Sequence, residues 1–219
     1  MKSIVLVLLS LIPAVAFAQQ DYIGGSATLI GNRGNAGYNL PGGTSWTFGF
    51  NAEVAKNVTN RVVVIGSGHY DRMEKIYIGD GHDTGFGVLS RVYLNGEQGD
   101  DVRFFASGGI GYNRHTNSQW SKAALNPSFG GGVNIRNTLI ISGSYLLPDL
   151  ISENNVKGFS FGAELFHPLS KNGKLQLHAK TSLTFFGFKQ NGVAERLWAG
   201  QLRNSIGIAY FPNYNKEQE

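Results

Sequence analysis

The sequence has 219 residues, a formal net charge of +4 and no cysteine, which excludes disulfides and thiolate metal ligands. Thirty glycines and an aromatic share of 12% favour an all-β fold. The basic residues are dispersed and form no run, so the composition argues against a nucleic-acid partner.

The first eighteen residues have the three regions of a secretory signal peptide. Lys2 precedes an apolar run over residues 4–17, and Ala16-Phe17-Ala18 forms a small-residue cleavage site. We expect residues 1–18 to be removed on export. No later stretch has the 18 consecutive apolar residues of a transmembrane helix.

The stretch Trp46 to Ala55 alternates without interruption between apolar residues and small or polar ones. A period of two indicates a β-strand with one apolar face. The other face carries Gly49, Asn51 and Glu53, which is typical of a strand with lipid outside and a polar lumen inside.

The same pattern predicts ten strands in chain order. They span Asp21–Gly31, Trp46–Ala55, Arg61–Asp71, Gly85–Asn95, Val102–Arg114, Asn126–Arg136, Leu139–Leu147, Gly158–His167, Lys174–Phe188 and Gln201–Phe211. Asn137 and Thr138 form the tight turn of a hairpin, whereas residues 115–125 are expected to form a long loop.

Long and short connections alternate along the chain, beginning and ending with a long one. Transmembrane barrels have long extracellular loops and short periplasmic turns, so both termini are placed in the periplasm and the strand number is even. The predicted fold is a closed antiparallel up-and-down transmembrane β-barrel over residues 19–211. Ten strands are favoured, eight are the alternative, and residues 212–219 form a polar periplasmic tail.

Aromatic residues lie at outward-facing strand ends, where their rings prefer the level of the lipid headgroups. The predicted girdle consists of Trp46, Tyr70, Tyr112, Tyr145 and Tyr210.

The chain resembles the small outer-membrane β-barrel proteins of Gram-negative bacteria, which include opacity-type adhesins and OmpA-like barrels. The resemblance rests on the strand pattern and on a last strand with Ser205, Gly207 and Tyr210-Phe211, similar to the signal read by the barrel-insertion machinery. It implies an outer-membrane location, contact with lipid and lipopolysaccharide, and a monomer. The alternative is a soluble lipocalin-like or streptavidin-like barrel with its apolar face inward.

Parity along the strands points several charged residues into the lumen near its periplasmic end. This predicted cluster comprises Glu53, Arg91, Arg103, Arg136, Glu164, His178 and Lys180. We expect these charges to pair and plug a narrow lumen, because unpaired ions in a confined space are costly. The alternative is a constriction whose excess of arginine favours anions.

A third possibility is a hydrolase at the extracellular rim, because omptin proteases are ten-stranded barrels with Asp and His there. The candidate residues are His69, Asp71, Asp80, His82 and Asp83. The run His115 to Ser118 is also faintly similar to lipid A deacylases. No motif matches either family, so the sequence predicts no catalytic residue, no cofactor and no metal site. The favoured role is structural or adhesin-like, with the long loops contacting a host or surface partner.

Overall fold

A computed structural model describes residues 21–34, 45–73, 81–96, 100–117, 121–151, 157–188 and 197–213. The predicted signal peptide and most of the predicted tail lie outside these residues. The ten strands are β1 (Tyr22–Gly34), β2 (Ser45–Thr59), β3 (Val62–Met73), β4 (Gly81–Tyr93), β5 (Val102–Asn117), β6 (Ser121–Ile135), β7 (Leu139–Leu146), β8 (Lys157–Pro168), β9 (Leu175–Phe188) and β10 (Leu197–Tyr210). No helix among the described residues is long and apolar enough to cross a membrane.

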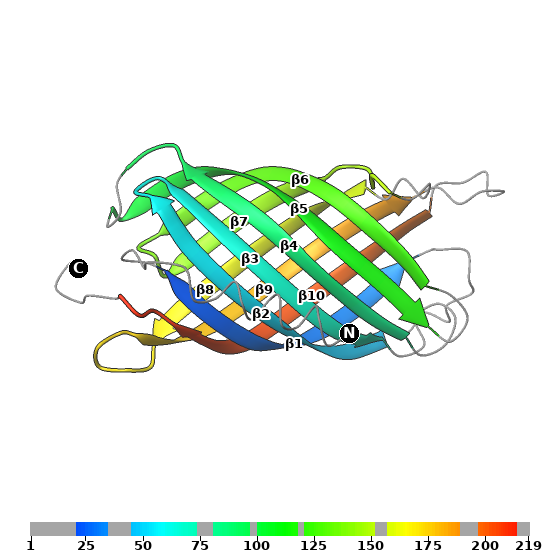
Figure 1. The fold of residues 1–219 in the computed structure, drawn as a ribbon, viewed down its shortest axis with the longest axis horizontal. Coiled ribbons are helices and arrows are strands. Elements are labelled where there is room, and N and C mark those ends of the chain that lie inside the picture. The colour runs from blue at the N-terminus through cyan, green and yellow to red at the C-terminus, as the bar shows by residue number, and fades with distance from the viewer. Residues whose placement is uncertain are drawn as a thin grey trace.

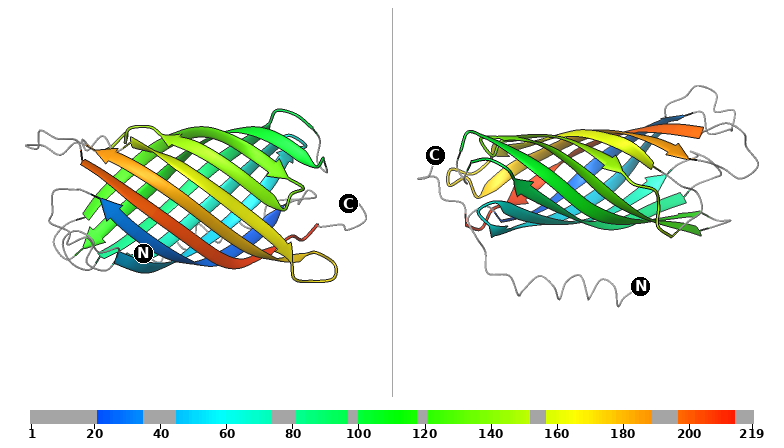
Figure 2. Two further views of the ribbon diagram at one scale, coloured as in Figure 1. Left: turned by 180° about the vertical axis from the view of Figure 1, so that it is seen from behind. Right: turned by 90° about the horizontal axis from the view of Figure 1, so that it is seen from above.

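Every strand pairs antiparallel with its neighbours in sequence, and β1 pairs with β10 to close the barrel (Figures 1 and 2). This confirms the predicted ten-stranded up-and-down barrel. Following the paired residues once around from Tyr22 leads back to β1 at Gly34, twelve residues further along. With usual strand spacings, this stagger corresponds to a strand tilt of about 40°.

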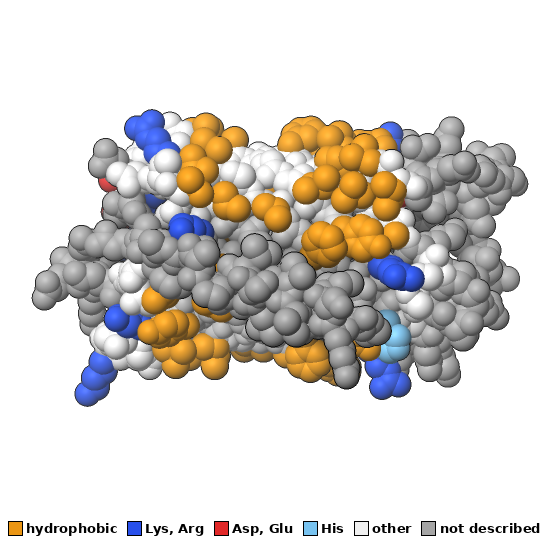
Figure 3. Space-filling model, viewed as in Figure 1, with side chains coloured by type: hydrophobic (Ala, Val, Ile, Leu, Met, Phe, Trp, Pro, Cys, Tyr) orange, Lys and Arg blue, Asp and Glu red, His pale blue; other side chains and the backbone are white. Residues whose placement is uncertain are grey.

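The outer surface of the barrel is apolar. Phe48 and Phe50 are 71% and 68% exposed, and apolar side chains of the other strands surround the wall in the same way. Figure 3 shows these side chains on one face, with Lys and Arg gathered towards the two ends. The soluble-barrel alternative is therefore wrong, because it would place the large apolar side chains inside.

Several strands extend further towards the long-loop end than the sequence pattern predicted. β5 continues to Asn117 and β6 begins at Ser121, so most of the stretch 115–125 is strand and the predicted long loop there is wrong. The backbone pairing continues through this hairpin as far as Thr116 and Ser121, although the residue types there do not alternate in hydropathy. Side chains also bond across it, since Arg114 Nε donates to Ser121 Oγ and Thr116 Oγ1 contacts Ser121 Oγ at 3.1 Å.

The strand β6 rises above its shorter neighbour β7, whose last residue, Leu146, pairs with Ser128. The chain after β7 covers the edge that this leaves. Leu147 N donates to the carbonyl of Pro127, and Leu150 N donates to the carbonyl of Leu125. The buried carboxylate of Asp149 accepts the Leu125 N–H at 2.7 Å. Pro127 has no N–H to leave unpaired at this position.

Candidate functional site in the barrel lumen

An aromatic floor closes the lumen at the end where the short turns join the strands. Tyr22 and Phe166 lie at 5.4 Å between ring centroids, and Phe211 packs against both at 5.2 and 5.6 Å. On the opposite wall Tyr93 and Phe105 meet edge to face at 5.8 Å. The floor comprises the buried residues Tyr22, Ala55, Ile65, Tyr93, Phe105, Ile140, Phe166, Ala209 and Phe211.

Charged residues form a layer next to the floor. Glu53, Arg91 and Glu164 each stand two positions along their strands from a floor residue, so they point inward with it. Arg91 Nη2 donates to Glu164 Oε1, and Lys180 Nζ reaches Glu53 at 2.5 and 2.6 Å. These four residues, all in the predicted lumen cluster, therefore form two ion pairs across the lumen.

His178 and Tyr22 connect this ion layer to the floor. The His178 ring lies 3.9 Å from Glu53 and 3.8 Å from Glu164, and it stacks on Phe166 at 4.3 Å. The Tyr22 hydroxyl donates to Glu53 at 3.4 Å. The layer contains two carboxylates, one guanidinium and one ammonium group, so the charges of its acidic residues balance those of Arg91 and Lys180. The anion-pore alternative requires an excess of cationic groups, which this layer does not have.

Arg103 points inward, but it belongs to a separate group beside Tyr93. Its guanidinium lies 4.0 Å from the Tyr93 ring centroid, and Nη2 donates to Asn137 Oδ1 at 2.6 Å. Asn134 Nδ2 donates to the Tyr93 hydroxyl at 3.0 Å and to the same Asn137 oxygen at 3.1 Å. This network joins the inner wall of β4, β5 and β6 to the turn of the β6–β7 hairpin.

The prediction that Arg136 lies in the lumen is wrong. Arg136 and Asn137 both have φ of 52°, so they form the two central residues of the hairpin turn in place of Asn137 and Thr138. The inward alternation of β6 therefore ends before Arg136. Its side chain is 72% exposed and contacts Asp101 at 3.1 Å outside the barrel.

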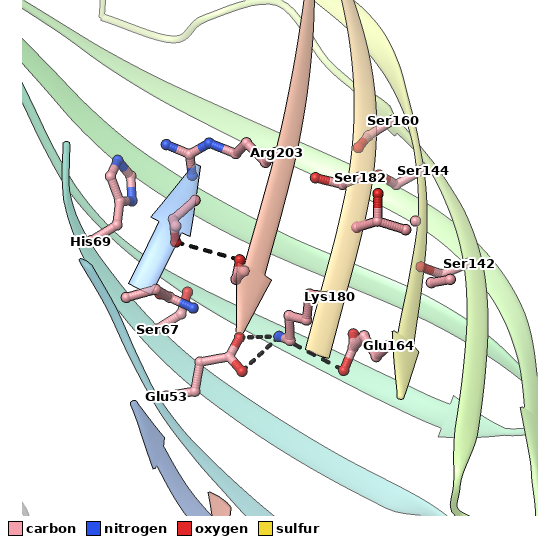
Figure 4. Close-up of a pocket in the computed structure, with 16 residues that line it drawn as sticks. Glu53, Ser67, His69, Ser142, Ser144, Ser160, Glu164, Lys180, Ser182 and Arg203 are labelled. Carbon is pink, nitrogen blue, oxygen red and sulfur yellow. Dashed lines mark hydrogen bonds and ion pairs between the residues drawn. The ribbon is translucent and has the colours of Figure 1, made fainter. Parts of the chain in front are cut away.

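Beyond the ion layer, towards the long loops, the lumen contains a cavity of about 270 Å³. Glu53, Lys180 and Glu164 lie at one end of it, and His69 and Arg203 lie at the other (Figure 4). Hydroxyl groups dominate the wall between them, supplied by Thr28, Ser67, Ser142, Ser144, Ser160, Ser182 and Ser205. These small side chains hold the lumen open where larger ones would fill it.

A second charged group lies at the long-loop end of the cavity. His69 Nε2 is 3.8 Å from Asp71 Oδ2 and 4.0 Å from Asp83 Oδ1, and Arg203 Nη2 donates to Asp71 Oδ2. The remaining rim candidates are not part of this group. His82 faces outward and contacts the Tyr70 hydroxyl at 2.7 Å, while Asp80 lies outside the described residues. In the His115 to Ser118 run only the side chain of Thr116 is described, and it contacts Ser121.

The predicted girdle residues whose side chains are described face outward. Tyr70 and Tyr210 are exposed, Tyr112 stacks on Phe86, and Tyr145 lies between two phenylalanines. The side chain of Trp46 lies outside the described part of the chain. Placement of these rings at the headgroup level stays a prediction.

No protein-family model matches the sequence, and no curated protein matches it. Solved structures with a similar fold include Neisserial surface protein A, with 10% identity, a TM-score of 0.40 and coverage of 87% of this chain and 96% of that one. The outer membrane protease OmpT of Escherichia coli has 7% identity, a TM-score of 0.49 and coverage of 90% and 99%. Ail, the attachment invasion locus protein of Yersinia pestis, has 14% identity, a TM-score of 0.35 and coverage of 88% and 100%.

At these identities the likeness concerns the fold alone. The chain itself combines a closed antiparallel barrel, an apolar exterior and a polar lumen, which are the features of a protein that crosses a membrane with strands. The protein is therefore a ten-stranded transmembrane β-barrel.

Proposed function

We propose that the protein is a non-conducting outer-membrane barrel that acts at the cell surface and not as a pore or an enzyme. The observation that carries this proposal is the filled lumen, where the aromatic floor and the charge-balanced ion layer lie one above the other. An ion crossing the barrel would have to displace packed apolar side chains and break buried ion pairs.

Conductance of the refolded protein in planar bilayers tests the closed lumen. We expect no current steps from the native chain. The double variant Tyr22→Ala/Phe166→Ala removes two adjoining rings of the floor and serves as an opened control that shows steps. Anion-selective steps from the native chain would overturn the proposal and favour the pore.

The adhesin-like part of the proposal concerns the long connections, which emerge at the end opposite the floor. Trp120 lies in the short connection between β5 and β6 at the same end, and tryptophan is enriched among the residues that dominate the energy of protein contacts. We expect bacteria that display the protein to attach to host cells. Replacing residues 35–44 or 189–196 by Gly-Ser linkers should reduce attachment while the barrel keeps its heat-modifiable gel shift. Unchanged attachment for every loop replacement would refute this role.

We propose that the outer wall of the barrel binds lipopolysaccharide. Arg72, His82 and Arg114 are exposed, face outward from β3, β4 and β5, and lie near the long-loop ends of these strands. Tyr70 and Tyr112 stand two positions below the arginines and would pack against acyl chains beneath the phosphates. The patch therefore matches an amphiphile with anionic headgroups.

Measuring lipopolysaccharide bound to the folded barrel tests this patch. A basic residue near an anionic lipid surface contributes about 1 kcal/mol, so Arg72→Ala/Arg114→Ala should weaken binding roughly 30-fold. Lys171→Ala, an exposed cation in the turn at the opposite end, is the matched control and should change binding little. Equal loss in both proteins would mean that general charge, and not this patch, determines binding.

A further inference from the structure

The group at the long-loop end of the cavity contains two kinds of metal ligand. His69, Asp71 and Asp83 each offer one ligand atom, and these atoms all lie within 4.8 Å of one another. They come from neighbouring positions on β3 and β4, where Asp71 pairs directly with Asp83 in the ladder. The rigid sheet therefore fixes their separation.

The surrounding backbone is shaped to admit these side chains. A Cβ added to Gly49 would lie 1.9 Å from Asp71 Oδ1, and a Cβ added to Gly85 would lie 2.4 Å from His69 Cε1. Both glycines belong to strands adjacent to the residue they accommodate. Any other residue at either position would displace a member of the group from its present place.

Two carboxylate oxygens of the group have no hydrogen-bond partner among the described residues, although they are buried. These atoms are Asp71 Oδ1 and Asp83 Oδ1, and the second faces His69 Nε2 at 4.0 Å. A buried carboxylate oxygen without a donor is costly, and a cation bound between His69 Nε2 and Asp83 Oδ1 would satisfy the second of these oxygens.

We propose that His69, Asp71 and Asp83 bind a divalent transition-metal ion, with lumen water completing its coordination. One imidazole nitrogen and two carboxylate oxygens match the preferences of Zn²⁺ and Co²⁺, whereas Ca²⁺ takes six or more oxygen ligands. His69 lines the cavity, so the site borders the space from which lumen water would complete the coordination.

The ligand atoms have to move closer together on binding. Tetrahedral coordination with bonds near 2.0 Å places ligand atoms about 3.3 Å apart, so the separations of 3.8 and 4.0 Å from His69 Nε2 close by less than about 1 Å. The ligand atoms of Asp71 and Asp83 lie within 4.8 Å of each other, so this separation closes by up to about 1.5 Å. Arg203 occupies one lone pair of Asp71 Oδ2, and a carboxylate oxygen retains a second for the metal. Such a donor holds a ligating carboxylate in place and partly balances its charge.

Zinc and cobalt titrations of the refolded barrel test the proposal. We expect one equivalent of Zn²⁺ to bind in competition with a chromophoric chelator, and Co²⁺ to give an absorption spectrum with imidazole and carboxylate ligands. His69→Ala and Asp83→Asn should each weaken Zn²⁺ binding at least about tenfold, because each removes one of three protein ligands.

The chain supplies two controls. His82→Ala removes a histidine at the same end of the barrel that faces outward, and it should leave zinc binding unchanged. Gly85→Ala keeps all three ligands but crowds the His69 ring, so it should weaken binding while the gel shift shows a folded barrel. The proposal is overturned if the native chain binds no stoichiometric Zn²⁺, or if His82→Ala weakens binding as much as His69→Ala does.

Discussion

Replacing Arg91 by methionine tests whether the ion layer stabilises the barrel only as a complete set. The Arg91 and Glu164 side chains are 7% and 12% exposed. Without the guanidinium, the carboxylate keeps only Lys180 at 3.7 Å and His178 at 3.8 Å, both beyond hydrogen-bond distance. Removing one partner of a buried pair costs about 3–5 kcal/mol, and the remaining ammonium group of Lys180 places Arg91→Met at about 3 kcal/mol.

The double variant Arg91→Met/Glu164→Leu removes both charges and leaves the Lys180 pair with Glu53 intact. Replacing a buried ion pair by apolar residues is often neutral or stabilising, so we expect its unfolding free energy to lie within about 1 kcal/mol of the native value. Reversible urea unfolding in lipid vesicles, followed by tryptophan fluorescence, gives these free energies and the coupling between the two sites.

Arg136→Met is the matched control, because it makes the same chemical change at a pair whose members are more than 70% exposed. We expect it to change stability by less than about 0.5 kcal/mol. Additive losses in the double variant, or an equal loss for Arg136→Met, would refute the argument that unpaired burial determines the cost.

Three further substitutions probe the seam, the wall and the floor. Gly207→Ala would place its Cβ 2.0 Å from the Gly25 carbonyl oxygen across the β1–β10 seam, so the yield of heat-modifiable barrel should fall sharply, whereas Gly111→Ala, with no atom within 4 Å, should fold normally. Phe50→Arg puts a charge into lipid and should cost about 2–4 kcal/mol in urea unfolding, against less than about 1 kcal/mol for Phe50→Leu. Phe211→Ala should cost about 3–5 kcal/mol by the same measurement, because it empties a buried part of the floor; a cost below about 1 kcal/mol would contradict the packing described.

The alternation of residue types was sufficient to predict most of the wall and part of the lumen. Parity placed Glu53, Arg91 and Glu164 on the inner face because each lies within an unbroken strand, where every second residue faces the same way. The prediction for Arg136 was wrong because the turn begins one residue earlier than the sequence indicated, so the alternation of β6 ends before Arg136. Strand periodicity has no information about where a hairpin turn begins.

The sequence pattern did not predict the floor, and it did not predict that His69, Asp71 and Asp83 alone among the described rim candidates come together. Phe105 and Phe166 are apolar residues at inward positions, and hydropathy alone does not tell a floor residue from a lipid-facing one. The sequence did contain one signal for the floor, because both phenylalanines are at inward-facing strand positions close to the short turns. His69 and Asp83 share a face only through the β3–β4 register, which determines that His69 meets Asp83 while His82 points to the opposite side.

The covered edge of β6 has a consequence for how the protein avoids its own copies. A strand that rises above its neighbour offers free backbone groups on which a foreign strand can add. Here the Asp149 carboxylate accepts the Leu125 N–H. Leu147 and Leu150, which lie on either side of Asp149, donate to the carbonyls of Pro127 and Leu125. Asp149 therefore ends the backbone pairing at this edge of the sheet, and its loss would expose the β6 edge to pairing with a strand of a second copy in the membrane.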